Sequence, residues 1–346
     1  MIQPHSSWAI NDSTKMEDYY TCPRMFMFRH RLGWKSDKPE NHLVFGEAMH
    51  KGIEHITLHG LTNESILTAY NDCFLPCYRR DFDESSDTLY SPKTPQAALQ
   101  ALLTYAMDDK AREFYYDWEP LDFDGVPSTE ICGSVPVDAD LRMSFRIDAI
   151  LKQKETGRMC VQENKTSGAK GYFRSIWRDE RSMSIQAGMY THVLYCMYPK
   201  EIVEGVIIHA FFFEELKAGP RITIEIIPLA LSFEWMQVWH WNLLQRLREL
   251  ELWDDMLMNS KIQNAEILRC FPINTTSCSK YGGCSFKDYC FSWPNPLHRA
   301  DEPPIGFKEH FWNPHDLESK HNLDLMEGNL KITVAQMVKE SNNDAL

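Results

Sequence analysis

The residues best suited to chemistry in this sequence are two carboxylates and a lysine, Asp148, Glu163 and Lys165. Alternating apolar residues predict strands over 145–151 and 158–165, joined by a turn. Asp148 then lies on the first strand and Glu163 on the second. Glu163 and Lys165 are two residues apart, so they share a face of the sheet. A carboxylate and an ammonium group are therefore expected side by side.

This set of residues has two interpretations. With the second carboxylate alongside, the oxygens would suit Mg²⁺ or Mn²⁺, and the lysine could position a water molecule or stabilise negative charge at phosphorus. That is the chemistry of phosphodiester hydrolysis. The alternative is a solvated surface hairpin, in which Asp, Glu and Lys are common. The motif alone favours the surface hairpin, so residues elsewhere in the chain are needed to distinguish the two interpretations.

The composition is that of an ordinary globular protein, with 346 residues, 43% hydrophobic and 25% charged. No apolar run is long enough to span a membrane, and no basic and apolar leader opens the chain, so we expect a cytoplasmic protein without a membrane partner. The net charge of −13 argues against a non-specific nucleic-acid coat but is compatible with a local basic groove.

The first 30 residues predict a helix, because Thr14 and a glutamate three residues later have the spacing of a capping box. Arg24, Arg29 and Arg31 follow as a basic patch interleaved with aromatic residues. Such a patch is typical of a nucleic-acid path, and these three arginines are candidate DNA contacts. It is equally typical of the solvated face of an amphipathic helix.

His50 lies on a predicted helix that ends near residue 59. A lone histidine there is usually a packed or surface residue, but it could bind a metal if the hairpin lies beside it. We take residues 1–60 as the N-terminal helices. Residues 61–120 predict a helical lobe, with a polar break at 83–87 and a helix over 95–116, and show no chemistry of their own.

Residues 121–230 predict an α/β core, and the predicted order is helix, three strands, helix, strand. Gln186 and Tyr190 are four residues apart and share one face of the second helix, which follows a loop containing Gly and Arg. The expected elements, in chain order, are strands over 130–137, 145–151 and 158–165, a helix over 182–197, a strand over 202–213 and its hairpin partner over 221–227.

Residues 231–293 predict a Trp-rich helix capped by Ser232, followed by clustered cysteines, and residues 294–346 a polar tail, weakly ordered or a docking segment beyond about 315. Cys270, Cys278, Cys284 and Cys290 lie within 21 residues, the last three as C-x5-C-x5-C. In a reducing compartment such clustered thiols favour Zn²⁺ or an iron–sulfur cluster over disulfides. Cys22, if it joined them, would staple the first helix to the end of the fold.

In this order the motifs resemble the PD-(D/E)xK nuclease superfamily. The resemblance is to its RecB-like exonucleases with an iron–sulfur cluster, which include the AddB nuclease domain, exonucleases of CRISPR adaptation and phage relatives. It covers roughly residues 13 to 292. The motifs are Y-x-x-C-P-R from Tyr19 to Arg24, G-x-x-x-H from Gly46 to His50, Asp148 in R-I-D, E-x-K at Glu163 and Lys165, Q-x-x-x-Y at Gln186 and Tyr190, and the cysteines.

The resemblance implies a restriction-endonuclease-like core with an inserted helical lobe and a cysteine-stapled C-terminal region. It implies that His50, Asp148 and Glu163 bind Mg²⁺ or Mn²⁺, that Lys165 helps to activate water, and that Gln186 and Tyr190 support the site or the DNA backbone. It also implies a 4Fe–4S cluster on Cys22, Cys278, Cys284 and Cys290. Relatives often have C-x2-C before the last cysteine, so Cys270 could replace one ligand.

The expected activity is metal-dependent exonuclease cleavage of DNA with single-stranded ends or overhangs. A protein partner in recombination, repair, phage replication or CRISPR adaptation would fit the resemblance. One alternative is a non-catalytic DNA-end-binding or assembly subunit that retains the fold. Another is an interaction protein in which the cysteines bind zinc.

Overall fold

The computed structural model describes residues 2–217, 219–279, 283–316, 319–325 and 333–343. Its centre is a mixed sheet in the order β11-β5-β6-β7-β8-β9, with β2 (Trp118–Pro120) added beside β6. The strands of that order are β5 (Thr129–Pro136), β6 (Arg142–Gln153), β7 (Met159–Ser167), β8 (Val203–Leu216), β9 (Gly219–Leu229) and β11 (His321–Asp324). The predicted α/β class is confirmed.

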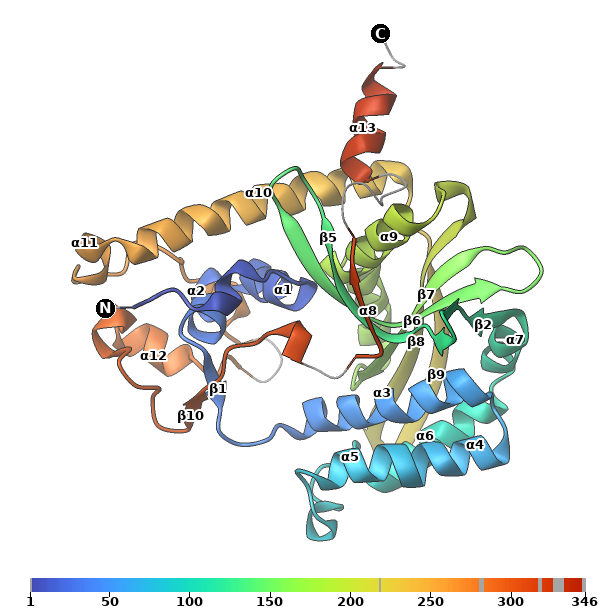
Figure 1. The fold of residues 1–346 in the computed structure, drawn as a ribbon. Coiled ribbons are helices and arrows are strands. Elements are labelled where there is room, and N and C mark those ends of the chain that lie inside the picture. The colour runs from blue at the N-terminus through green and yellow to red at the C-terminus, as the bar shows by residue number, and fades with distance from the viewer. Residues whose placement is uncertain (1, 218, 280–282, 317–318, 326–332, 344–346) are drawn as a thin grey trace.

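Two layers of helices cover the sheet (Figure 1). On one face lie α3 (Asn41–His59), α4 (Asn63–Thr68), α5 (Leu75–Arg79), α6 (Pro95–Met107) and α7 (Asp109–Asp117), with a π-helical turn over Ala69–Phe74. On the other lie α1 (Ser13–Thr21), α2 (Pro23–Phe26), α9 (Ile185–Met197) and α10 (Phe233–Met258). None of the helices in the described parts of the chain combines the length and apolar character needed to cross a lipid bilayer.

Strand β8 shows why the sheet needs both layers. Phe211 and Phe213 pack in the core under α3 and α6, whereas Phe212 packs in the core shared with α1, α9 and α10. Successive side chains of a strand point to opposite faces, so a strand that is apolar throughout is buried on both sides. The order helix, three strands, helix, strand follows, with β8 parallel to β7 and antiparallel to its hairpin partner β9.

Three expectations about local structure are corrected. The N-cap of α1 is Asp12, whose carboxylate accepts from Lys15 N at 2.7 Å, so Thr14 lies inside the helix. The helix predicted over 95–116 is broken at Asp108, which caps α7. The segment predicted as a loop after β7 contains helix α8 (Tyr172–Ser182), which the apolar Trp177 anchors to Phe212.

The segment after residue 294 is also more structured than predicted. β10 (Phe307–Glu309) pairs with β1 (Trp34–Ser36), and β11 joins the sheet edge parallel to β5. α13 (Val334–Asn343) follows, while 317–318, 326–332 and 344–346 of the predicted tail lie outside the described residues. The remaining short elements are α11 (Ser260–Gln263), α12 (Lys287–Ser292), β3 (Asp122–Phe123) and β4 (Val126–Pro127). The C-terminal region thus contributes one strand to the central sheet and one to the small sheet with β1.

Candidate active site

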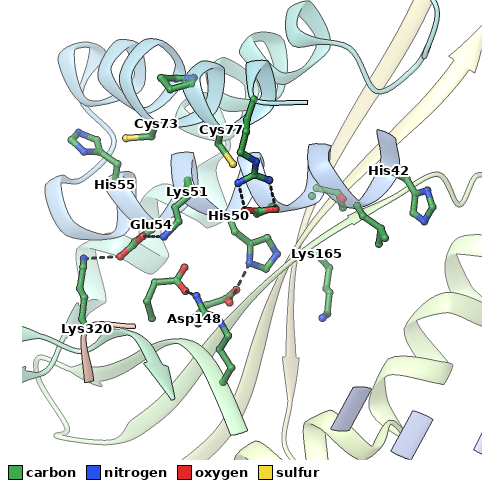
Figure 2. A pocket seen from close by; sticks show the side chains of 18 of the residues that line it. His42, His50, Lys51, Glu54, His55, Cys73, Cys77, Asp148, Lys165 and Lys320 are labelled. Carbon is green, nitrogen blue, oxygen red and sulfur yellow. Dashed lines mark hydrogen bonds and ion pairs between the residues drawn. The ribbon is translucent and has the colours of Figure 1, made fainter. Parts of the chain in front are cut away.

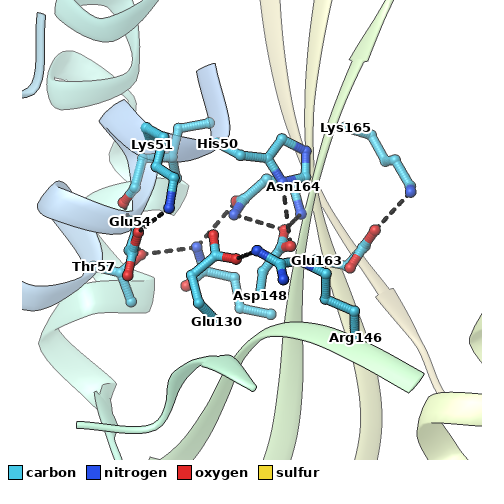
Figure 3. A network of polar contacts seen from close by, with 12 residues as sticks. His50, Lys51, Glu54, Thr57, Glu130, Arg146, Asp148, Glu163, Asn164 and Lys165 are labelled. Atoms are coloured by element: carbon cyan, nitrogen blue, oxygen red, sulfur yellow. Dashed lines mark hydrogen bonds and ion pairs between the residues drawn. The ribbon is translucent and has the colours of Figure 1, made fainter. Parts of the chain in front are cut away.

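Asp148, Glu163 and Lys165 lie together on the adjacent strands β6 and β7 (Figure 3). The antiparallel register pairs Ala149 with Gln162, and its extension by one residue sets Asp148 opposite Glu163. Lys165 Nζ lies 2.6 Å from Glu163 Oε1. The sheet therefore holds two carboxylates and one ammonium group as close neighbours, as the alternation of the sequence predicts.

His50 reaches this cluster from one of the helices that cover the sheet. It lies on α3, and its Nδ1 is 3.2 Å from Asp148 Oδ1. Burial lowers the pKa of His50, but the charge of Asp148 and the hydrogen bond to it outweigh that effect and raise the pKa to about 9. The same contacts hold the pKa of Asp148 below its usual value against the effect of burial. The pair is thus ionised at neutral pH.

Asp148 is fixed from its other side by Asn164. Both the backbone N and the side-chain Nδ2 of Asn164 donate to Asp148 Oδ2, at 2.8 and 3.0 Å. Gln162 Nε2 in turn donates to Asn164 Oδ1 at 3.1 Å and to Thr57 Oγ1 of α3 at 3.0 Å. Asn164 is the middle residue of E-x-K, and it is 3% exposed.

Glu163 is 3% exposed and has one unsatisfied oxygen. Burial, and next the charge of Asp148, raise the pKa of Glu163 to about 7. Its Oε1 faces Lys165, whereas Oε2 is buried with no hydrogen-bond partner among the described residues. A divalent cation can bind a buried carboxylate oxygen that accepts no hydrogen bond, together with an oxygen of a second carboxylate nearby. Glu163 and Asp148 offer such a pair of ligands.

The side chains as they stand do not enclose a cation. Within the described parts of the chain, no group of three or more His, Cys, Asp and Glu side chains is placed to hold a metal ion. The reason is that His50 and Asp148 bind each other while Glu163 binds Lys165. The roles of His50, Asp148 and Glu163 as ligands remain predictions, and the residues present fit that use.

The cluster opens into a cavity of about 1200 Å³ between the sheet and the helical lobe (Figure 2). His50, Asp148 and Lys165 line one side, and Cys73 and Cys77 of the lobe line the other. In the figure the His50 ring points from α3 toward Asp148. The cavity gives a bound molecule access to Asp148 and Lys165, while Glu163 is nearly fully covered.

Gln186 and Tyr190 lie on α9, directly beside the cluster. Gln186 Nε2 donates to Tyr190 OH at 2.8 Å, and Tyr190 OH donates to the carbonyl of Arg146 on β6. Burial raises the pKa of Tyr190 well above its usual value, and the charges of Glu163 and Asp148 add to this, so the hydroxyl stays protonated. Through Arg146 the pair fixes the strand that carries Asp148, two residues along.

A second polar group next to Asp148 was not predicted. Glu130 of β5 binds Arg146, and burial followed by the charge of Asp148 raises the pKa of Glu130. Glu54 of α3 accepts from Thr129 at 2.9 Å and pairs with Lys320 at 2.6 Å. These residues are far apart in the sequence, and no local pattern there marked them as neighbours.

The three arginines predicted to contact DNA differ in how exposed their side chains are. Arg24 is 4% exposed, and its Nε donates to Phe271 O at 2.9 Å. Arg31 is 2% exposed and binds Asp254 of α10 through two hydrogen bonds at 2.6 and 2.8 Å. Both guanidinium groups are engaged within the fold, so the structure offers neither to DNA. Arg29 is on the surface, paired with Asp18 at 2.9 Å, and its role stays a prediction.

The predicted cluster cysteines lie near one another. Cys22 Sγ accepts from Asn274 N at 3.3 Å, which joins the first helices to the cysteine loop. Burial raises the pKa of the Cys290 thiol to about 12; Arg24 opposes this, and Cys22, Cys284 and Cys278 add to it. Cys270 is 1% exposed, and burial raises its pKa to about 11. As stated above, no metal-binding group is formed in the described residues, so the cluster stays a prediction.

A family model described as the PD-(D/E)XK nuclease superfamily matches residues 13–291. The matched region includes every motif residue discussed above and ends before the C-terminal segment that brings Lys320 to the cavity. The mixed α/β architecture agrees with the restriction-endonuclease-like fold of that superfamily. No curated protein matches the chain.

Proposed function

The chain belongs to the PD-(D/E)XK nuclease superfamily, and on this premise we propose that it is a metal-dependent exonuclease that hydrolyses DNA from single-stranded ends. The observation that carries the proposal is that buried Glu163 lies beside Asp148 and Lys165, which both line an open cavity. A surface hairpin would leave these side chains solvated, whereas Glu163 is 3% exposed. Superfamily membership implies a nuclease with DNA as its substrate.

His50, Asp148 and Glu163 would hold Mg²⁺ or Mn²⁺. When bound, such an ion polarises the scissile phosphate and lowers the pKa of a bound water molecule. Lys165 Nζ can donate to that water or to a phosphate oxygen, and its positive charge stabilises the negative charge that develops at phosphorus. Attack by the water oxygen forms one P–O bond and releases a proton from the water to solvent. The bond to the leaving oxygen breaks, and that oxygen takes up a proton from solvent.

Gln186 and Tyr190 would act as positioning residues. Tyr190 OH holds the backbone of β6 at Arg146, and Asn164 holds Asp148 itself. Fixed carboxylates lose little of their binding energy to reorganisation when substrate arrives. The two contacts therefore support a pre-organised site.

We also propose that the chain is of the RecB-like type, with a structural 4Fe–4S cluster on Cys22, Cys278, Cys284 and Cys290. The proximity of these thiols and the hydrogen bond from Asn274 N to Cys22 Sγ support it. Zinc is the alternative occupant. Anaerobically purified protein that is brown and contains iron supports the cluster, and colourless protein that contains zinc contradicts it.

The expected setting is the cytoplasm, where the chain would act with a protein partner in recombination, repair, phage replication or CRISPR adaptation. The net charge of −13 supports the need for a partner, because a chain with this charge has little long-range attraction for DNA. A partner would add to the affinity of the chain for DNA.

The test is digestion of end-labelled linear DNA, single- and double-stranded, and of circular single-stranded DNA, in Mg²⁺, Mn²⁺ or EDTA. We expect metal-dependent shortening of linear strands, intact circles, and loss of activity in Glu163→Ala. Glu155→Ala, in the exposed turn of the same hairpin, is the matched control. Cleaved circles would contradict an exonuclease. Intact DNA in every condition, with binding retained, would favour the non-catalytic DNA-end-binding subunit.

A further inference from the structure

Lys93 is a lysine of the active-site cavity that the proposed mechanism does not use. It belongs to the helical lobe, where the next residue, Thr94, caps α6. It lines the same cavity as Asp148 and Lys165. The sequence predicts no chemistry for this lobe. Only the folded structure shows that Lys93 lies at the active-site cavity.

Lys93 differs from the other cations of the cavity in having no acidic partner. Each of the others has a carboxylate within 4.0 Å: Lys51 and Lys320 pair with Glu54, Arg80 with Glu47, Arg146 with Glu130, and Lys165 with Glu163. Among the described residues Lys93 pairs with none, and its Nζ contacts the hydroxyl Thr166 Oγ1 at 3.4 Å. Its positive charge is therefore uncompensated within the described fold.

The surroundings of Lys93 make that charge costly. Its Nζ lies 5.9 Å from the centroid of the Phe45 ring. Burial lowers the pKa of Lys93 to about 8. An ammonium group that is partly removed from water without a counter-charge is unfavourable unless an anion is supplied. A molecule that enters the cavity with a negative charge would supply it.

The place of Lys93 indicates which anion this is. Thr166 directly follows Lys165 on β7, and both residues line the cavity. Gly46 of α3 lies beside Thr166, because a Cβ added at Gly46 would be 3.6 Å from Thr166 Oγ1. A strand that lies in this cavity with its scissile phosphate at Lys165 would carry further phosphates past the residues that line it, Lys93 and Thr166 among them.

We propose that Lys93 and Thr166 form a second phosphate-binding site, which holds a phosphate of the DNA strand adjacent to the one being cleaved. The ammonium group and the hydroxyl both donate to phosphate oxygens, and such contacts position a strand without reading its sequence. The site rests on the proposed function, because it takes its substrate class from it. The phosphate can be an internal diester or the terminal phosphate of the strand end.

The test measures binding of a labelled single-stranded oligonucleotide to the full-length protein in EDTA at a series of salt concentrations. For Lys93→Gln and Lys93→Met we expect the slope of log affinity against log salt to become shallower by about 0.7, the value for one lost phosphate contact. At low salt the affinity should fall about tenfold. Lys93→Met keeps the aliphatic stem over Phe45, so it decides the outcome if Lys93→Gln does not fold.

Two further variants and the chemistry of the DNA end complete the design. Lys93→Arg should restore the slope, and Lys51→Gln, the matched control at a paired lysine, should keep it close to that of the wild type. A loss confined to DNA with a phosphorylated end would identify the terminal phosphate, and an equal loss with hydroxyl ends an internal diester.

The opposing results are separable. Folded Lys93→Met with the affinity and slope of the wild type would overturn the site, as would a wild-type protein that binds no DNA. A wild-type protein that shows the Lys93-dependent slope but cleaves nothing in Mg²⁺ or Mn²⁺ would contradict the proposed function and leave the phosphate site in place.

Discussion

Asn164 holds Asp148 through two hydrogen bonds to one carboxylate oxygen, from its backbone N at 2.8 Å and from Nδ2 at 3.0 Å. Behind Asn164, Gln162 connects to Thr57 of α3, and Thr57 to Tyr115 of α7. A chain of hydrogen bonds therefore runs from the helical lobe to the carboxylate expected to bind metal. The lobe supports the site as well as covering it.

We predict that Asn164→Ala weakens metal use more than it weakens DNA binding. Residues that orient a metal ligand typically contribute 10- to 100-fold in metal affinity or activity, and the Mg²⁺ concentration for half-maximal cleavage should rise by about this factor. DNA affinity in EDTA should stay near that of the wild type. Asn322→Ala, at an exposed position of the same sheet, is the control. An unchanged metal requirement would count against a positioning role for Asn164.

The Arg31–Asp254 pair provides a stability prediction. Asp254→Ala leaves the fully buried Arg31 guanidinium without its counter-charge, which should lower the free energy of unfolding by about 3–5 kcal/mol. Urea denaturation measures this loss. Glu249→Ala, which removes an exposed partner of Arg246, should cost about 1 kcal/mol or less. Equal losses in the two variants would show that Arg31 is not held as the structure indicates.

Gly133 of β5 lets the C-terminal strand dock. A Cβ added at this residue would lie 2.0 Å from the backbone oxygen of Leu323 on β11. Gly133→Ala should therefore displace β11 and make residues 319–325 a target for limited proteolysis. Gly168→Ala, whose Cβ would meet only Phe213 O at 4.0 Å, should resist protease as the wild type does. Resistance in both variants would argue against the paired strand.

His192 should make the fold sensitive to acid. Burial lowers its pKa from 6.5 to about 4, so between these pH values the unfolded chain binds more protons than the folded one. Stability is therefore lost as pH falls from 6.5 to 4, by up to about 3 kcal/mol from this group. His192→Gln can still donate to Pro136 O and should flatten this dependence. A variant with the same dependence on pH as the wild type would exclude this origin.

The sequence was a good guide where chemistry and local pattern coincide. The two-residue spacing of Glu163 and Lys165 on an alternating strand is enough to predict that they are neighbours, and the apolar run over 202–213 is enough to predict the strand β8. The order of the motifs, through the family resemblance, predicted that His50 and Asp148 belong to one site. Their spacing in the sequence could not predict this, because they lie on different elements.

Other features depend on tertiary contacts. Helix α8 follows Gly168 and Gly171, which signal a loop, and it is held by Trp177 on Phe212 and by Arg174 on Glu214. The basic patch of the N-terminal helices allowed either solvent or DNA, but Arg31 meets Asp254 more than 200 residues away. Lys93, likewise, becomes a candidate phosphate ligand only in the folded structure, where it lines a cavity together with residues of the distant strand β7.

The measurement that tests the central claim most directly is the single-turnover rate of DNA cleavage in Mg²⁺ or Mn²⁺, with DNA binding measured in parallel. For Asp148→Ala and Lys165→Ala we expect cleavage to fall by about 100-fold or more, while DNA binding is nearly retained. Asp148→Ala removes a proposed metal ligand, and Lys165→Ala removes the positive charge that would stabilise the transition state. Lys152→Ala, an exposed lysine of β6, should cleave as the wild type does. Cleavage retained in both Asp148→Ala and Lys165→Ala would contradict this active site.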